Sequence, residues 1–158
     1  MLEEIISDRK KKLARLKSEG VEAYPIKTKR THRIGDVLAD FAKLEKGKKK
    51  VAIAGRVMGL RDMGNVIFLD VHDGSGKLQI VLKKDNLANF AIVKGTTDRG
   101  DFVTTGGTLF ITKTKEKSIE AKEFAMLEKS VRPMPDKWAG LEDVETRLRE
   151  RYLDILAH

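Results

Sequence analysis

The stretch VIFLDVHDGSGKLQIVLK, from Val66 to Lys83, decides the fold. Residues 66–72 and 77–83 are rich in β-branched and apolar side chains that alternate with polar ones, which is typical of strands. Between them stands Asp73-Gly74-Ser75-Gly76, and Asp, Gly and Ser together favour a tight turn. The stretch therefore predicts an antiparallel β-hairpin.

The hairpin has one apolar face and one mixed face. Successive side chains of a strand point to opposite faces, so each face can be read directly from the alternation. The predicted core face holds Ile67, Leu69, Val71, Leu78, Ile80 and Leu82. The predicted outer face holds Phe68, Asp70, His72, Lys77, Gln79, Val81 and Lys83. The large aromatic ring of Phe68 is thus expected on the outside of the hairpin, where its exposure calls for a functional explanation.

The segments around the hairpin predict a small barrel. Further strands are expected at 51–60, 101–112 and 118–128, and a helix at 86–94. Gly55 and the pair Gly106-Gly107 predict bends or bulges. Five strands with a helix between the third and fourth predict a mainly β fold with α, a five-stranded OB-fold Greek-key barrel. An antiparallel sandwich is the alternative, but it explains the inserted helix less well.

Helical segments flank the predicted barrel. Residues 2–19 form an amphipathic pattern that ends at Gly20, with Leu2, Ile5, Ile6, Leu13 and Leu16 on one stripe, and a second helix is expected at 36–44. After residue 129 an extended linker containing Trp138 leads to a helix at 142–156, with Val144, Leu148, Tyr152 and Ile155 on one stripe. We expect three parts: a basic helical extension (1–50), the barrel (51–129), and a linker with its helix (130–158).

The positive charge is concentrated in the first part. The chain has 32 Lys and Arg against 24 Asp and Glu, a net charge of +8, and residues 1–50 hold 15 against 8, or +7. A basic segment of this kind predicts a polyanionic partner, although a solvated helix face is the alternative for any one cluster. The 158 residues contain no cysteine and no apolar run near the roughly 20 residues that a membrane span needs. A cytoplasmic location without membrane contact is expected.

No catalytic pattern is recognisable. The histidines His32, His72 and His158 have no metal-ligand spacing, and no GxxxxGK[ST] phosphate loop occurs. The chain is therefore expected to bind rather than catalyse, without a metal or cofactor of its own.

The outer face of the hairpin is the candidate binding surface, because OB-folds bind oligonucleotides there. Phe68 can stack on an unpaired base, and Gln79, with a donor and an acceptor, can recognise a base edge. Arg61 at the end of the first strand is placed to reach the same base or its phosphate. The alternative for Phe68 is a ring folded over the barrel rim.

Several motifs resemble the anticodon-binding OB domain of class II lysyl-tRNA synthetases. They are VAIAGRVM (51–58), RDMG (61–64), Phe68, DGSGKLQ (73–79), the segment from Leu13 to Pro25, KTKE (113–116), RPMPDKW (132–138), GLEDVETR (140–147) and RYLD (151–154). The resemblance covers essentially the whole chain. It departs from the family at Lys115 and Lys117, where glycine and leucine are usual.

The resemblance implies roles for particular residues. Phe68 would stack on the central uracil of the lysine anticodon, Gln79 and Arg61 would hydrogen-bond it, and Glu116 would approach a neighbouring base. Candidate phosphate contacts are Arg9, Lys10, Lys11, Lys12, Lys77 and Lys113. ATP and Mg2+ belong to the catalytic part of a full-length enzyme, which would attach lysine to its tRNA and form a homodimer, whereas this fragment is expected to be a monomer.

Three alternatives stay open at this point. The chain could be a stand-alone OB-fold that binds single-stranded nucleic acid without base preference. It could be the same domain of an aspartyl or asparaginyl enzyme, because Asn65-Val66-Ile67 resembles that branch. It could also be a protein-interaction module whose helical stripes at 2–16 and 144–155 bind partners.

Overall fold

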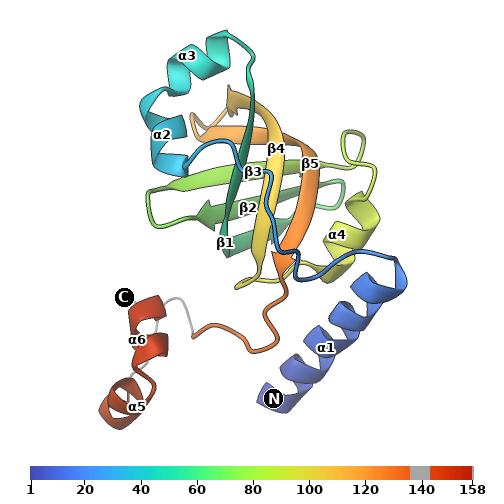
Figure 1. Cartoon of the computed structure of the whole chain (residues 1–158), viewed down its shortest axis with the longest axis vertical. Helices are drawn as coiled ribbons and strands as arrows, with labels where there is room; N and C mark the ends of the chain where they lie inside the picture. The colour runs from blue at the N-terminus through green and yellow to red at the C-terminus, as the bar shows by residue number, and fades with distance from the viewer. Residues whose placement is uncertain (136–142, 158) are drawn as a thin grey trace.

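Five strands close into a barrel in the order β1-β2-β3-β5-β4 (Figure 1). The strands are β1 (Lys50–Asp62), β2 (Val66–His72), β3 (Lys77–Lys83), β4 (Phe102–Ile111) and β5 (Lys117–Glu128). All neighbouring pairs are antiparallel except β3 and β5, which run parallel. This is the predicted OB-fold barrel. The computed structural model describes residues 1–135 and 143–157.

The barrel interior is filled by the predicted core face of the hairpin. Each of its six residues is at most 3% exposed: Ile67, Leu69, Val71, Leu78, Ile80 and Leu82. Burial of one such side chain stabilises a fold by about 1.5–3 kcal/mol. The alternation of the hairpin therefore sets both the core and, on the opposite face, the site described below.

Two glycines allow strands to approach closely. The pairing of β4 with β5 shifts between Gly106 and Gly107, which confirms the predicted bulge, and a Cβ at Gly107 would collide with the carbonyl oxygen of Glu120. At Gly55 a Cβ would lie 2.5 Å from the carbonyl oxygen of His72. The irregularity of β1 is not at Gly55, however. It lies between Val57 and Gly59, and the predicted bend is displaced accordingly.

The predicted helix at 36–44 is two short helices, α2 (Ile34–Ala39) and α3 (Phe41–Lys46), which meet at Asp40. The hairpin turn explains the earlier start. Asp73 Oδ2 accepts a hydrogen bond of 2.8 Å from the Ile34 N–H, and Ser75 Oγ accepts one of 2.9 Å from the Gly35 N–H. The turn thereby caps a helix that lies far away in the sequence.

Helix α4 (Phe90–Thr96) is the predicted helix between β3 and β4, shifted toward the C-terminus from 86–94. Its start is delayed because the Asn86 N–H donates to the Lys83 carbonyl and forms a turn at the end of β3. Gly95 lies within the helix rather than ending it. A Cβ at this position would collide with the guanidinium of Arg15, so glycine makes room for that side chain.

Helix α1 (Leu2–Ser18) lies against α4 (Figure 1). Leu16 is buried in the common core, but Leu2 and Ile5 at the other end of the predicted stripe are exposed. Only the C-terminal half of the stripe is therefore covered within the described residues.

The predicted helix at 142–156 is divided into α5 (Val144–Arg149) and α6 (Arg151–Ala157), with a break at Glu150. Asp143 caps α5 by accepting from the Thr146 N–H at 2.8 Å. The predicted stripe is exposed, with Val144, Leu148, Tyr152 and Ile155 each at least 59% accessible. Trp138 and the middle of the predicted linker lie outside the described residues. Among the helices of residues 1–135 and 143–157, none is both long and apolar enough to span a membrane.

Candidate nucleic-acid interface

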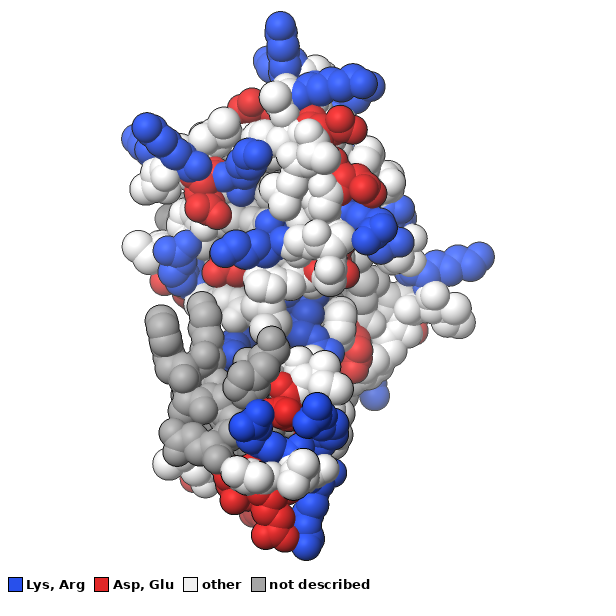
Figure 2. Space-filling model, turned by 90° about the vertical axis from the view of Figure 1, so that its left-hand side faces the viewer, with Lys and Arg blue, Asp and Glu red and all other residues white. Residues whose placement is uncertain are grey.

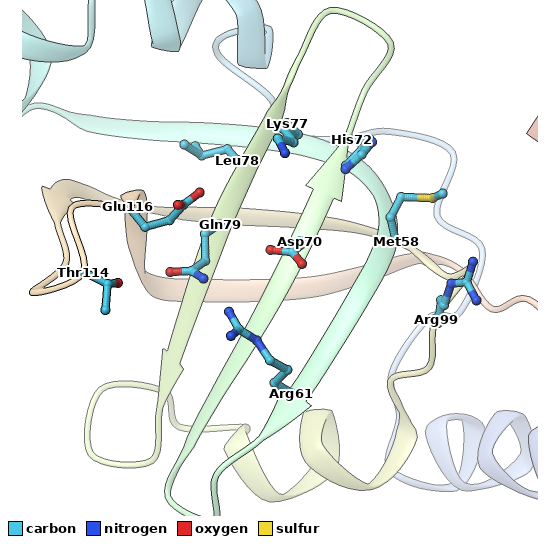
Figure 3. A pocket seen from close by; sticks show the side chains of 10 residues that line it. All are labelled: Met58, Arg61, Asp70, His72, Lys77, Leu78, Gln79, Arg99, Thr114 and Glu116. Carbon is cyan, nitrogen blue, oxygen red and sulfur yellow. The ribbon is translucent and has the colours of Figure 1, made fainter. Parts of the chain in front are cut away.

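A hollow of about 590 Å³ lies on the outer face of β1, β2 and β3, next to the loop between β4 and β5 (Figure 3). It is lined by Met58, Arg61, Asp70, His72, Lys77, Leu78, Gln79, Arg99, Thr114 and Glu116. Three residues that the sequence analysis singled out, Arg61, Gln79 and Glu116, thus meet at one place although they come from three different segments.

Strand register explains this meeting. Asp70 of β2 lies opposite Gln79 of β3, and Gln79 lies opposite Ser118 of β5. In the next row on the same face, Arg61 of β1 lies opposite Phe68 of β2. In Figure 3 the guanidinium of Arg61 points toward Gln79 and Asp70. The row of Asp70 and Gln79 forms the floor of the hollow, and the row of Arg61 and Phe68 forms its edge.

Phe68 stands at the edge rather than in the lining. Its ring is half-buried, opposite Val81, and the guanidinium carbon of Arg61 lies 5.5 Å from the ring centroid. This distance is within the range of a cation–π contact. A base in the hollow would therefore meet the ring and the guanidinium as neighbouring surfaces.

Gln79 is on the predicted face, but it is only 7% exposed. Two neighbours cover it: β5 runs beside β3, and the loop before β5 contributes Glu116 to the same hollow. The hydroxyl of Ser118 donates a hydrogen bond of 2.9 Å to Gln79 Oε1. Gln79 is thus held in position by its surroundings and does not move freely on a surface.

The loop that carries Glu116 is closed around Thr112. The Thr112 N–H donates to the Glu116 carbonyl at 2.9 Å, and the Glu116 N–H donates to Thr112 Oγ1 at 3.0 Å. The hydroxyls of Thr112 and Thr114 lie 3.0 Å apart. Lys115 adopts a left-handed backbone with φ of 62°. A residue with a Cβ is strained in this conformation, so the closed loop carries strain at one residue.

Charges of both signs surround the hollow. Arg61, Lys77 and Arg99 supply cations, and Asp70 and Glu116 supply carboxylates. The carboxylate of Asp70 lies over Gly59, where a Cβ would come within 2.5 Å of Oδ2. Two carboxylates would repel a phosphate, whereas a nucleobase offers both donors and acceptors to such a lining. The hollow therefore suits a base, with phosphates at its rim.

The hairpin turn keeps the rim in place. Asp73 Oδ1 accepts from the Ser75 N–H at 2.8 Å and from the Ser75 hydroxyl at 2.6 Å. Burial alone would raise the pKa of Asp73, but hydrogen bonds from Ser75 and from the N–H groups of Ile34 and Gly76 outweigh it and lower the pKa below its ordinary value. An ionised Asp73 thus fixes the turn from which Lys77 starts.

The barrel matches a known family. Residues 51–127 match the tRNA anticodon family, described as an OB-fold nucleic acid binding domain. The barrel is similar to this family throughout its length. The matched range runs from the start of β1 to the end of β5 and includes the whole hairpin.

Similarity to known proteins extends beyond the barrel. The chain is 42% identical to a lysine–tRNA ligase of Dehalococcoides mccartyi, over 100% of this chain and 33% of the relative. It is 42% identical to that of Xanthomonas campestris, over 96% of this chain and 32% of the relative. It is 37% identical to the lysine–tRNA ligase of Pelotomaculum thermopropionicum, over 99% of this chain and 31% of the relative. The chain spans about a third of the length of these relatives.

Two residues that the sequence analysis proposed as phosphate contacts have a structural role in this protein. Arg9 is 7% exposed, and its guanidinium donates to the carbonyls of Ser130 at 3.1 Å, Arg132 at 3.1 Å and Arg99 at 3.0 Å. Lys12 Nζ pairs with Asp98 at 2.7 Å and with Asp8 at 3.0 Å. Both residues therefore hold α1 to the barrel, a structural role that the sequence analysis did not predict.

Lys12 belongs to a larger buried ionic cluster. Lys129 is 2% exposed, and its Nζ lies 2.5 Å from Asp98 and 2.9 Å from Asp101. Burial opposes the charge of Lys12, but its bonds to Asp98 and Asp8 raise its pKa. Burial likewise opposes ionisation of Asp98, yet bonds from Lys12 and Lys129 lower its pKa. The cluster joins α1, the start of β4 and the end of β5.

The remaining phosphate candidates are accessible. Lys10 and Lys11 are exposed on α1, Lys77 is exposed at the rim of the hollow, and Lys113 is exposed in the Thr112 loop. Figure 2 shows Lys and Arg side chains spread among acidic ones on one face of the molecule, without a single continuous basic patch. Lys77 and Lys113 come from segments that border the hollow, whereas Lys10 and Lys11 come from a helix at the other end of the barrel (Figure 1).

Several residues of the site were not predicted. Asp70 was placed on the outer face with Phe68, two residues away, but it was given no role in binding. Ser118 and Thr112 carry no such signal, since their roles depend on the parallel pairing of β3 with β5 and on the loop closure. Arg99 lines the far end of the hollow from the segment before β4.

Proposed function

We propose that this chain recognises the anticodon of lysine tRNA, as the N-terminal part of a lysine–tRNA ligase. The observation that carries the proposal is the meeting of Arg61, Gln79 and Glu116 in one hollow beside Phe68. The family of the barrel and the relatives' likeness over the whole chain support it.

In this proposal a base leaves the anticodon stack and enters the hollow. The central uracil stacks on Phe68, which stabilises a bound base by about 1–3 kcal/mol without distinguishing one base from another. Arg61 and Gln79 hydrogen-bond its edge and supply the distinction. Glu116, in the preformed Thr112 loop, receives a donor group of a neighbouring anticodon base.

Phosphates on either side of the bound base would be held by cations at the rim. Lys77 and Lys113 are the candidates nearest the hollow, and Lys10 and Lys11 are candidates for a more distant part of the tRNA. Each phosphate contact on a single strand adds about 0.7 to the slope of log affinity against log salt concentration.

The rest of the proposal concerns a longer protein. The longer protein would attach lysine to tRNA, as the relatives' name says. It would be a homodimeric cytoplasmic enzyme that uses ATP and Mg2+. We assign none of this chemistry to the 158 residues. The described residues contain no group of three or more His, Asp and Glu that could hold a metal ion. Residues 1–50, 51–129 and 130–158 would serve as basic extension, recognition barrel and linker, and the 158-residue chain alone would be a monomer.

Titration with anticodon stem-loops that differ only at the central base tests the proposal. We expect the uracil-centred loop of the lysine anticodon to bind the 158-residue chain most tightly, and tighter than a loop with an aspartate or asparagine anticodon. Equal affinity for all central bases would show instead a single-strand binder without base recognition. Weak binding with little salt dependence would show that RNA is not the partner.

A further inference from the structure

Beside Gln79, on the neighbouring strand β5, lies a fully buried serine. Ser118 is 0% exposed, stands opposite Gln79 in the pairing of β3 with β5, and donates from Oγ to Gln79 Oε1 at 2.9 Å. Neither Ser118 nor its hydrogen bond is part of the lining of the hollow. Its effect on a ligand must therefore pass through Gln79.

An amide side chain has two unlike ends, an oxygen that accepts and an NH2 group that donates. When Ser118 binds the oxygen, the NH2 end is left for the hollow. We propose that Ser118 is a positioning residue that sets the orientation of the Gln79 amide, so that Gln79 donates to a carbonyl oxygen of the bound base. This inference rests on the proposed function, because it concerns the same hollow.

In the structure the oxygen end of the Gln79 amide lies next to Ser118. Ser118 Oγ is 2.9 Å from Gln79 Oε1 and 3.3 Å from the Glu116 carbonyl oxygen. A hydroxyl has one proton, and the shorter contact is the stronger hydrogen bond. In the reverse orientation the Gln79 NH2 would donate a hydrogen bond to Ser118 Oγ, and the Ser118 hydroxyl would donate to the Glu116 carbonyl. The amide oxygen of Gln79, an acceptor, would then face the hollow.

With this orientation, the groups that face the base have a defined pattern. Arg61 offers only donors, and Gln79 now offers a donor as well. The acceptor is the carboxylate of Asp70, which makes no side-chain hydrogen bond within residues 1–135 and 143–157. The carboxylate of Glu116 is left for the neighbouring base. Uracil presents two carbonyl oxygens on either side of one N–H, which matches two donors and an acceptor. Cytosine places an amino group where uracil has a carbonyl, and a donor would then face a donor.

The test compares uracil-centred and cytosine-centred stem-loops on the 158-residue chain. For Ser118→Ala we expect the affinity for the uracil loop to fall about threefold to tenfold, the loss of one well-aligned hydrogen bond, while the cytosine loop changes little. The ratio of the two affinities should therefore shrink. An unchanged ratio in Ser118→Ala would overturn the proposal.

Thr105→Val is the matched control. Thr105 is 1% exposed, and its hydroxyl donates to the Glu123 carbonyl at 2.8 Å, away from the lining of the hollow. The Thr105→Val variant removes one buried hydroxyl from the same barrel and should leave the ratio of the uracil-loop and cytosine-loop affinities unchanged. A ratio that shrinks equally in Thr105→Val would show that general loosening of the barrel, and not the orientation of Gln79, causes the effect.

Gln79→Ala separates this proposal from the proposed function. If the wild type shows no preference for uracil, the proposed function fails. If Gln79→Ala removes the preference and Ser118→Ala keeps it, only the role of Ser118 fails. A measurement without RNA is the NMR signal of the Gln79 side-chain amide, assigned from its absence in Gln79→Ala. We expect both its protons to exchange with water rapidly, and one protected proton would show the reverse orientation.

Discussion

Arg9 in α1 and Ser130 after β5 are 121 residues apart in the sequence, yet Nη1 of Arg9 donates to the Ser130 carbonyl at 3.1 Å. The same guanidinium reaches the carbonyls of Arg132 and Arg99. One side chain thus joins the first helix, the segment before β4 and the chain that leaves the barrel. A lysine could not satisfy these acceptors together, because its donors lie on a single nitrogen.

Arg9→Ala should destabilise the chain by about 2–4 kcal/mol, because three carbonyls lose their partner and packed area around the buried Arg9 is lost. Urea unfolding measures this loss. Arg9→Lys should recover only part of it. Lys10→Ala, an exposed neighbour on the same helix, is the control and should stay within about 0.5 kcal/mol of the wild type. If instead Arg9→Ala folds normally but loses tRNA affinity, Arg9 contacts phosphate after all.

Replacement of Phe68 by Ala should lower the affinity for the uracil-centred stem-loop by about 1–3 kcal/mol through loss of stacking. The barrel offers a matched pair elsewhere: Arg56 lies over the ring of Phe102 at 4.4 Å, much as Arg61 lies over Phe68. Phe102→Ala removes an equivalent ring and should leave RNA affinity unchanged. Equal losses in both variants would point to destabilisation of the barrel rather than to stacking.

Asp73 gives a pH-dependent prediction. Its pKa is lowered from 3.8, so the folded state favours its ionised form. The stabilisation is complete above the unfolded value of 3.8 and is lost as the pH falls through the lower, folded value. Asp73→Ala should therefore cost about 1–3 kcal/mol near neutral pH and progressively less in strong acid.

Urea unfolding of this variant at several pH values checks the sign. Asp85→Ala is the control, because Asp85 is an exposed acid in the turn after β3 and should show little effect at any pH. A difference between Asp73→Ala and the wild type that grows as the pH falls would contradict the assignment.

The left-handed backbone of Lys115 predicts that glycine is better there. Lys115→Gly should stabilise the chain by up to about 1 kcal/mol, since glycine adopts φ near 62° without the Cβ clash. Lys113→Gly in the same loop removes the same charge at a residue without positive φ, and should destabilise slightly. Thermal unfolding of both variants measures their stabilities relative to the wild type. A stabilisation of equal size in both variants would show that the removed charge, and not the backbone conformation of Lys115, is the cause.

Glu116→Gln tests the acceptor role of the loop. The amide keeps the size of the carboxylate and replaces one acceptor by a donor. We expect little change in preference at the central base and a changed preference at one neighbouring base, measured with stem-loops substituted at each anticodon position. Unaltered preferences at all three positions would exclude Glu116 from base recognition.

Much of the fold followed from alternation alone. The hairpin from Val66 to Lys83 has the predicted limits, its apolar face is the core, and the bulge occurs at Gly106-Gly107 as expected. The helices were less predictable, because their ends depend on distant partners. Helix α2 begins at Ile34 since Asp73 and Ser75 cap it, and no local pattern reveals that contact.

The site was predicted in outline but not in its support. Strand alternation placed Phe68 and Gln79 on one face, yet it left Gln79 exposed, because the parallel neighbour β5 was not foreseen. Arg9 could have been interpreted correctly. It stands four residues from both Ile5 and Leu13, in the apolar stripe of α1, where burial is the expectation.

The closure of the 112–116 loop by Thr112 has a consequence for the thermodynamics of binding. A loop that becomes ordered only around its ligand loses conformational entropy at that moment, and affinity falls accordingly. Here the hydrogen bonds of Thr112 to Glu116 order the loop during folding. Complex formation then restricts mainly the RNA, so rigidifying the nucleotides of the anticodon should improve affinity more than rigidifying the protein.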